Sequence, residues 1–146
     1  MKIITKKLHL ETKSQMEFVD ITTEIEQIIV DSGIREGQVT IYSPHTTASI
    51  VVNHNEPMLV KDFMRVMSRL IPISNRYSHD LFEISRSRTS DGRSNGHSHC
   101  KCLLLSTSET LPIERGKMIL TDTQSIFFAE MDGGRKRDVI IKIVGL

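Results

Sequence analysis

The feature that most constrains the fold of this chain is a long polar stretch from Ser74 to Ser98, in which apolar residues nearly vanish and Ser, Arg, Asp, Asn, Gly and His dominate. A structureless loop of this length is uncommon in a compact domain, and such loops are usually functional or disordered. His79 precedes its central part, residues 86–93, and further histidines follow it. We therefore interpret the stretch as a functional loop that is mobile at its centre and is shortened by a helix near Tyr77 to Glu83.

The composition predicts one globular domain over residues 1–146. Of the 146 residues, 38% are apolar and only 5% are aromatic, with no Trp, so the core must be aliphatic. The 19 Lys and Arg nearly balance the 18 Asp and Glu, which gives no electrostatic case for nucleic-acid binding. There is no apolar run of about 18 residues that would span a membrane, and the N-terminus lacks the apolar region of a signal peptide. We expect a cytoplasmic protein with neither nucleic-acid nor membrane partners.

Apolar periodicity predicts the elements on both sides of the polar stretch. Alternation and helical spacing indicate strands over Lys2 to Thr12, Gln38 to Ser43 and Thr46 to Asn53, and helices over Asp20 to Ser32 and Asn55 to Leu70. Further strands are predicted over His99 to Thr107, Lys117 to Thr121, Ser125 to Glu130 and Arg137 to Val144, with a connecting turn at Thr110 to Gly116 and a hairpin at Gly133-Gly134. Strands with two to three interspersed helices predict an α+β domain built on a mainly antiparallel sheet.

The ends of both long helices carry residues that are typical of caps. Asp20 or a nearby Thr is expected to cap the start of the first helix, and Gly33 suits its end. Asn55 is the expected N-cap of the second helix, and Pro57 is tolerated in its first turn.

The two cysteines, Cys100 and Cys102, lie in the predicted strand over His99 to Thr107. They would point to the same side of that strand, yet so short a loop makes a disulfide awkward. We interpret them as small buried hydrophobes in a reducing compartment, with a metal role for Cys100 as the alternative.

Four of the six histidines fall in three short polar segments, and this predicts a metal or acid–base site. In the predicted strand His97 and His99 share one face, so one ion could accept two imidazoles there. Catalytic zinc typically takes three protein ligands and keeps one position for water or substrate. The predicted ligands and catalytic residues are His45, His79 and His99, with His97 and His54 as weaker candidates. A carboxylate such as Asp80 commonly orients a ligating imidazole.

Two further groups of polar residues predict an anion site. Thr46 and Thr47 follow the strand break at Pro44 and supply hydroxyls, and Asn53 ends the next strand. The second cluster near the C-terminus comprises Gln124, Glu130, Asp132, Arg135 and Arg137. Its arginines can pair with the nearby carboxylates or bind phosphate bidentately, and Glu130 or Asp80 would orient a ligand or shuttle a proton. On spacing alone, residues 135–137 also fit a solvated hairpin, and His9 fits an ordinary surface residue.

Blocks of residues along nearly the whole chain resemble the YjbQ family, in the same order and with similar spacing. They are His45-Thr46-Thr47-Ala48-Ser49, Asn53, Glu56-Pro57 and Asp62, then Tyr77-Ser78-His79-Asp80 and Asn95-Gly96-His97-Ser98-His99, and finally Pro112-Ile113, Gly116, Gln124-Ser125-Ile126, Glu130-Met131-Asp132-Gly133 and Arg135-Lys136-Arg137.

The resemblance implies a compact α+β fold, a homotrimer and a secondary, low-level thiamine-phosphate synthase activity, which joins a pyrimidine diphosphate to a thiazole phosphate and releases pyrophosphate. It also places the family's conserved site at His45, His79 and His99. Three departures stand out. His54 replaces a common Glu near the site and could add a ligand or alter substrate preference, Gly134 replaces a common Pro, and residues 121–123 replace a pattern with Gly and Trp.

Two function classes follow. The first is a metal-assisted enzyme that acts on a phosphorylated or anionic small molecule. Its metal would be zinc, because three imidazoles fit zinc better than magnesium, which prefers oxygen. The alternative is a non-catalytic trimer that binds a metabolite or a metal through the same residues. A third possibility is that the histidines only stabilise the subunit interface.

Overall fold

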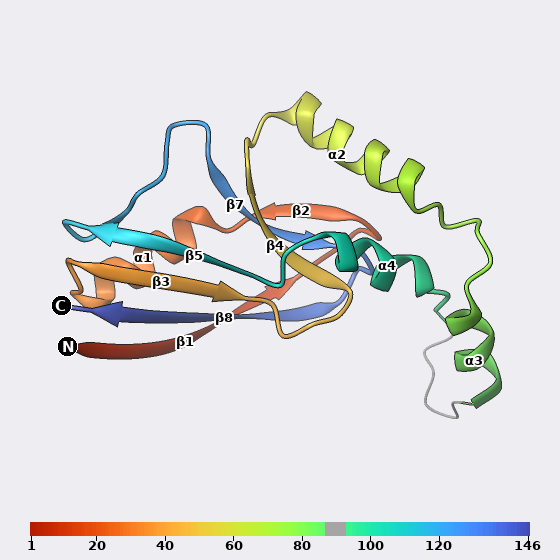
Figure 1. The fold of residues 1–146 in the computed structure, drawn as a ribbon, viewed down its shortest axis with the longest axis horizontal. Helices are drawn as coiled ribbons and strands as arrows, with labels where there is room; N and C mark the ends of the chain where they lie inside the picture. Colours follow the sequence, from red (N-terminus) through yellow and green to blue (C-terminus); the bar gives the residue numbers. More distant parts are fainter. Residues whose placement is uncertain (87–92) are drawn as a thin grey trace.

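The computed structural model describes residues 1–86 and 93–146, which form two antiparallel sheets and four helices (Figure 1). The five-stranded sheet has the order β1 (Lys2–Glu11), β8 (Lys136–Gly145), β3 (Gly37–Tyr42), β5 (Ser108–Glu114) and β6 (Lys117–Met118). The three-stranded sheet has the order β2 (Glu17–Asp20), β7 (Ser125–Glu130) and β4 (Ala48–Asn53). The helices are α1 (Thr22–Ser32), α2 (Pro57–Leu70), α3 (Ser78–Arg86) and α4 (Gly96–Leu104). The predicted α+β class with antiparallel sheets is confirmed.

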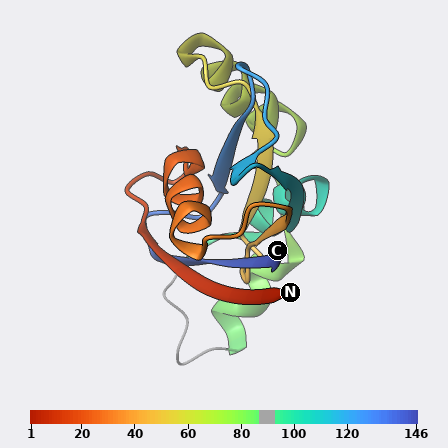
Figure 2. The same ribbon diagram turned by 90° about the vertical axis from the view of Figure 1, so that its left-hand side faces the viewer.

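The main core lies on one face of the five-stranded sheet, where α1 and the three-stranded sheet cover it (Figure 2). Alternate side chains of β8, such as Val139 and Ile141, point into this core and meet Ile25 of α1 and Phe128 of β7. Since successive side chains of a strand face opposite ways, β7 contributes to both sides of its own sheet. Its next residue, Ala129, packs with Cys102 of α4 in a second, smaller cluster.

The first half of the chain contains the predicted strands and helices, together with strand β2, which was not predicted. The cap expected at Asp20 or a nearby Thr was wrong, because Ile21 is the N-cap of α1 and makes no side-chain cap hydrogen bond; Asp20 Oδ1, one residue earlier, accepts a hydrogen bond from Thr22 N at 3.0 Å. Gly33 ends that helix with the left-handed φ of 67° that suits glycine. The expected N-cap of α2 was wrong by one residue. Glu56, and not Asn55, accepts hydrogen bonds from the backbone N–H groups of the first turn. A carboxylate there also complements the positive end of the helix dipole.

The strand predicted over His99 to Thr107 was wrong, because residues 96–104 form α4. The interactions that hold α4 recur at helical spacing: Lys101 contacts His97 one turn earlier, and Ser98 and Cys102 both face β7 and the residue after it. Cys102 is therefore buried while Cys100 is exposed, and both thiols are free. The expected same-side pair of buried cysteines was wrong for the same reason.

Two connections also differ from the prediction. The expected turn at Thr110 to Gly116 is mostly strand β5, in which Leu111 and Ile113 face the core. The expected hairpin at Gly133-Gly134 was wrong, because β7 and β8 belong to different sheets. The strand predicted over Lys117 to Thr121 is reduced to Lys117–Met118, and the described residues hold four helices instead of two to three.

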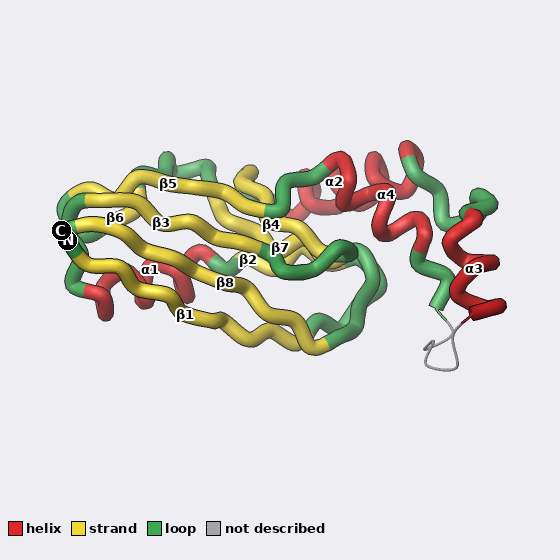
Figure 3. The backbone as a smooth tube through the Cα atoms, turned by 60° about the horizontal axis from the view of Figure 1, so that its bottom comes forward, coloured by secondary structure: helices red, strands yellow, loops and turns green. Residues whose placement is uncertain are grey.

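Helices α2, α3 and α4 lie together at one end of the molecule, and both termini lie at the other (Figure 3). The predicted short helix near Tyr77 to Glu83 is confirmed as α3, whereas most of the segment expected to be mobile, residues 87–92, lies outside the described residues. None of the described helices is long and apolar enough to cross a membrane.

Candidate functional site

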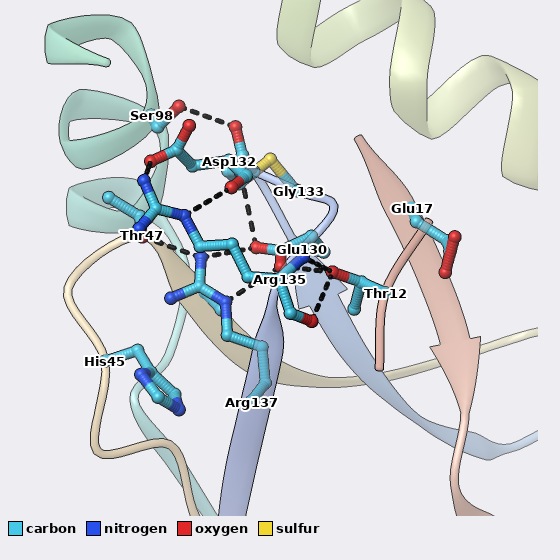
Figure 4. Close-up of polar contacts among 12 residues, drawn as sticks. Thr12, Glu17, His45, Thr47, Ser98, Glu130, Asp132, Gly133, Arg135 and Arg137 are labelled. Atoms are coloured by element: carbon cyan, nitrogen blue, oxygen red, sulfur yellow. Dashed lines mark hydrogen bonds and ion pairs between the residues drawn. The ribbon is translucent and has the colours of Figure 1, made fainter. Parts of the chain in front are cut away.

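A buried ion pair joins the two sheets at the end nearest α4 (Figure 4). Glu130 ends β7 and faces the large sheet, while Arg137 starts the inward-facing series of β8. Arg137 Nε lies 2.8 Å from Glu130 Oε1, and Arg137 Nη2 lies 2.6 Å from Oε2. The side chain of Glu130 is fully buried and that of Arg137 is 5% exposed. Two parallel hydrogen bonds make this the strongest kind of carboxylate–guanidinium contact.

The remaining lone pairs of Glu130 are also used. Thr12 Oγ1 donates to Glu130 Oε1 at 2.7 Å, and the backbone N–H of Asp132 donates to Oε2 at 3.2 Å. Arg137 Nη2 donates to Thr47 Oγ1 at 2.8 Å. A buried charge is tolerated only when it is paired and hydrogen-bonded, and this pair meets both conditions. Glu130, Arg137 and Thr47, each predicted as a site residue, therefore contact one another.

Asp132 organises the adjoining loop. Its carboxylate accepts a hydrogen bond from Arg135 Nη2 at 2.6 Å and from Asn95 Nδ2 at 2.9 Å. Arg93 Nη1 lies 3.6 Å from the other carboxylate oxygen and donates to the backbone carbonyl of Asp132 at 2.8 Å. Together with the Glu130–Arg137 pair, this polar cluster brings the guanidinium groups of Arg93, Arg135 and Arg137 against the carboxylates of Asp132 and Glu130, and the side chains of Arg93 and Arg135 are 34% and 30% exposed.

The position of His45 follows from the end of strand β3. The strand stops at Tyr42, and His45 Nε2 accepts a hydrogen bond from the backbone N–H of Asp138 on β8 at 3.0 Å. Because a neutral imidazole has one acceptor nitrogen and one donor nitrogen, this contact leaves the proton on Nδ1. Burial and the neighbouring Arg137 charge both lower the pKa of His45 below its ordinary value of 6.5. His45 is thus a neutral hydrogen-bond donor at neutral pH.

His79 on α3 is the opposite tautomer to His45, with its proton on Nε2. Asn95 donates a hydrogen bond from its amide N–H to Asp132, so its carbonyl oxygen faces His79 Nε2 at 3.1 Å and accepts a hydrogen bond from the Nε2–H group. The lone pair of His79 therefore lies on Nδ1. The ring of His99 on α4 lies edge-on to that of His79, with 4.8 Å between ring centroids. The structure brings these two predicted ligands together, one of them with its acceptor nitrogen fixed by an outer partner.

His97, a weaker metal candidate, is a buried structural residue. It is 2% exposed, and its Nδ1 lies 2.9 Å from Lys101 Nζ, one helical turn further along α4. Lys101 is itself fully buried, and burial lowers the pKa of its amine. Burial and the Lys101 charge likewise lower the pKa of His97 from 6.5.

Acidification is expected to destabilise the protein through His97. Because the folded-state pKa lies below 6.5, the unfolded chain binds more protons below that pH, and stability is lost as pH falls, by at most about 1.4 kcal/mol per pH unit for one group. Urea unfolding between pH 7.5 and 5 should show a steeper loss for the wild type than for His97→Gln. His45, whose pKa is also lowered from 6.5, acts in the same pH range in both proteins, whereas Asp20 and Glu56, whose pKa values are lowered too, act at more acidic pH. Equal slopes for both proteins would contradict this role of His97.

A hollow of about 600 Å³ opens beside His45. We call it the His45 hollow. It is lined by His45, Thr46, His99, Cys102, Leu103 and residues 105–108. Three predicted site residues thus meet in one concave site from segments far apart in the chain. This volume falls in the range of small-molecule sites, about 300–1,000 Å³.

The other predicted site residues lie outside the His45 hollow and make hydrogen bonds to nearby backbone groups. Gln124 accepts a hydrogen bond from Thr121 N, and Asn53 accepts one from the backbone of the exposed His54. Asp80 Oδ1 accepts a hydrogen bond from Gly96 N at the start of α4. Within residues 1–86 and 93–146, no three His, Cys, Asp or Glu side chains are grouped to hold a metal ion. The predicted set of three histidine ligands is therefore not assembled there as a cluster.

Several residues that build the site carried no specific prediction. They are Thr12, Arg93, Asn95, Lys101 and Asp138. For Lys101 the signal was its spacing of four from His97, which becomes visible once α4 is taken as a helix. Asn95 and Asp138 were detectable only as polar neighbours of predicted site residues, and Thr12 and Arg93 gave no signal in the sequence.

The fold and this polar site define a class of compact α+β proteins with antiparallel sheets and a His-rich hollow. A family model described as "UPF0047 protein YjbQ-like" matches residues 6–146. The chain belongs to this family, as the resemblance indicated.

Curated relatives and solved structures agree with this assignment. A UPF0047 protein of Methanothermobacter thermautotrophicus is 34% identical over 99% of this chain and 94% of its own, and one of Archaeoglobus fulgidus is 37% identical over 93% and 98%. A crystal structure of a YbjQ-like protein of unknown function from Sulfolobus solfataricus P2 has a TM-score of 0.89 and 32% identity, and it covers 99% of both chains. An uncharacterised YjbQ/UPF0047 protein from Clostridium acetobutylicum has a TM-score of 0.82 at 31% identity, covering 95% of this chain and 99% of its own.

Proposed function

We propose that this protein binds a phosphorylated or otherwise anionic small molecule in the His45 hollow and acts on it as an enzyme. The observation that carries the proposal is the hydrogen bond from Asp138 N to His45 Nε2, which fixes Nδ1–H as a donor in a residue that lines the hollow. A donor of fixed orientation recognises an acceptor such as a phosphate oxygen without reorganising.

The chemistry of the lining supports an anion in preference to a cation. The described lining residues supply the hydroxyls of Thr46, Ser106, Thr107 and Ser108 and contain no carboxylate. Beside His45 lies the Arg137 guanidinium, which is paired with Glu130, and burial together with this charge lowers the pKa of that imidazole.

Zinc is part of the proposal, with His79 and His99 as its ligands. The fit within one chain is partial: among the described residues no hydrogen-bond donor occupies His79 Nδ1, which lies on the ring beside His99, whereas His45 uses its acceptor nitrogen for Asp138. A bound zinc would supply a Lewis acid for the anionic substrate. Thiamine-phosphate synthase activity stays a prediction from the family resemblance, and the non-catalytic metabolite- or metal-binding protein stays the alternative.

Assembly into a homotrimer is also proposed. Helices α2, α3 and α4 carry large apolar side chains that are more than half exposed, namely Met58, Val66, Leu70, Leu81, Leu103 and Leu104. Large exposed apolar surfaces commonly mark interaction sites. Mass photometry, run on every sample described below, gives the number of chains in the particle.

Replacing His45 with Phe is expected to weaken the binding of inorganic phosphate by about tenfold or more, because a charge-assisted hydrogen bond contributes about 1.5–3 kcal/mol. Isothermal titration calorimetry on zinc-loaded protein measures this. His9→Phe is the matched control, since His9 also contacts Asp138 but is exposed and lies outside the hollow lining. Undetectable phosphate binding by the wild type, or equal affinity in His45→Phe, would overturn the anion site.

The choice between enzyme and binding protein needs a turnover measurement. Phosphate or pyrophosphate release from phosphorylated substrates, lost in His99→Ala while particle mass is unchanged, favours the enzyme. Metal content of wild type, His79→Ala and His99→Ala tests the zinc proposal on the same samples. Ligand binding without turnover of any tested phosphate ester favours the alternative.

A further inference from the structure

We infer that this protein has a second binding surface, away from the His45 hollow, that docks an extended acidic segment of a partner protein. The surface is a groove between α1 and the turn that joins β5 to β6, at the end of the molecule that carries both termini (Figure 3). It consists of two adjoining hollows of about 220 and 350 Å³, which share Ile29, Val30, Gly116 and Lys117. We call it the α1–β6 groove.

The floor of the α1–β6 groove is apolar. Ile29 and Ile34 are each 1% exposed and Met118 is 8% exposed, because their side chains belong to the main core. Val30 of α1 also lines the groove and is 63% exposed. The groove is open at the turn, since a Cβ atom added to Gly116 would meet nothing beyond its chain neighbours nearer than 3.9 Å. An aliphatic side chain of a partner would be removed from water there.

Three of the lining residues are basic. Arg35, Arg115 and Lys117 are exposed, and no carboxylate of a described residue forms an ion pair with any of them. Glu26 supplies one carboxylate to the lining, whereas Glu36 lies outside it and accepts a hydrogen bond from Arg115 N at 3.0 Å. The three basic residues and one carboxylate give the lining a net charge of +2. A partner segment that carries carboxylates complements this charge.

The conformation of Arg115 points to a role for its side chain. Among the described residues it is the only one other than glycine with a positive φ, 53°, and Gly116 after it has a φ of 80°. A two-residue hairpin turn with positive φ at both positions strongly prefers Asn-Gly, because a larger side chain is strained there. The turn alone would select asparagine at position 115, so a contact made by the guanidinium group explains the arginine.

An extended peptide fits this groove better than a nucleic acid does. Strand β6 is the last strand of its sheet, and no other strand in the described part of the chain pairs with its outer side. An extended peptide can add to such an edge through main-chain hydrogen bonds while its side chains enter neighbouring pockets. Single-stranded nucleic acids bind by stacking on aromatic side chains, and the lining of the groove contains no aromatic residue.

The test uses isothermal titration calorimetry of the full chain with three capped hexapeptides at low ionic strength. The acidic probe has the order Asp-Glu-Leu-Val-Glu-Asp. One control replaces its four carboxylates with amides, and the other replaces Leu-Val with Ser-Ser. We expect the acidic probe to bind about tenfold more tightly than either control, through several exposed ion pairs and one buried aliphatic side chain. Added salt should weaken its binding, because salt screens exposed charges.

Arg115→Asn separates a binding role from a structural one. Asparagine tolerates a positive φ, so this variant should be at least as stable in urea as the wild type, yet bind the acidic probe about threefold more weakly. Adding Lys117→Gln should increase the loss to about fivefold or more. Lys61→Gln with Lys142→Gln is the matched control, because both lysines are exposed and lie outside the groove. This control should bind the probe with wild-type affinity.

Different results would overturn the inference in different ways. Equal affinities for the acidic and amide hexapeptides, or an unchanged affinity in Arg115→Asn with Lys117→Gln, would remove the role of the basic side chains. A particle mass that falls in this double variant would place a second copy of the chain in the groove. A single-stranded oligothymidine that binds more tightly than the acidic probe, and is lost in the same variant, would assign the groove to nucleic acid.

Discussion

Replacing Glu130 with Ala is expected to lower the free energy of unfolding by about 3–5 kcal/mol, because the substitution leaves the Arg137 guanidinium buried without its counter-charge. It also removes the acceptor for Thr12 Oγ1 and for the backbone N–H of Asp132. The ion pair links the two sheets, so the backbone amides of both sheets should lose their protection from hydrogen exchange together. Urea unfolding followed by fluorescence or circular dichroism gives the change.

Two variants control for this result. Glu114→Ala removes an exposed carboxylate at the end of β5 and should change stability by no more than about 0.5 kcal/mol. The double substitution Glu130→Leu with Arg137→Met removes both charges, and it should restore much of the stability lost in Glu130→Ala. A loss below about 1 kcal/mol in Glu130→Ala would mean that the pair stabilises neither the core nor the contact between the sheets.

Phe128→Ala is expected to cost about 3–5 kcal/mol of stability through the cavity that it leaves, and to weaken phosphate binding by the protein that remains folded. Phe128 is fully buried on the face of β7 toward the large sheet, and its ring lies edge-on to the His45 imidazole, with 6.4 Å between centroids. Without it, His45 is free to rotate away from Asp138.

Phe127→Ala separates the two effects of Phe128→Ala. Phe127 is equally buried on the neighbouring position of β7, but it packs edge-on to Phe18 and has no ring contact with His45. Both variants should lose similar stability in urea, and only Phe128→Ala should lose phosphate affinity when titrated at low temperature in the absence of urea. Equal phosphate affinities would contradict the coupling between the core and His45.

The elements of the first half were predictable because their periodicities are regular and their boundaries carry specific residues. The alternation before Glu11 and the helical spacing of Ile21, Ile25 and Ile29 coincide with the burial observed in β1 and α1. The prediction was wrong at Pro112, because proline is common in turns and here lies within strand β5. Proline lacks only the backbone N–H donor, and the carbonyl oxygen of Pro112 accepts a hydrogen bond from Ile119 N at 3.0 Å.

Helix α4 was missed because its stability comes from tertiary contacts. The consecutive leucines 103–105 suggested a strand, and Asn95 offers no side-chain cap hydrogen bond to signal the helix start. What holds the helix is Ser98 Oγ donating to the carbonyl of Met131, together with Cys102 packing on Ala129. Partners more than 25 residues away are invisible to local periodicity.

The residue types of the site were predictable, but their pairing was not. Position and chemistry singled out His45, Thr46 and His99, which line one hollow. The arginines 135 and 137 looked equally suited to phosphate and to carboxylates, and the packing of two sheets against each other placed Asp132 and Glu130 within their reach. No linear pattern specifies which of these partners a guanidinium meets.

The hydrogen bond between Asp138 and His45 has a consequence for solubility. Within residues 1–86 and 93–146, no strand pairs with the β3 side of β8 beyond Tyr42, and the imidazole binds a backbone donor that would otherwise be left unpaired there. Unpaired donors along a strand are templates for pairing with other chains. A substitution at position 45 that lacks an acceptor therefore exposes a short strand edge to pairing with other chains, so the histidine that lines the hollow also protects the sheet against self-association.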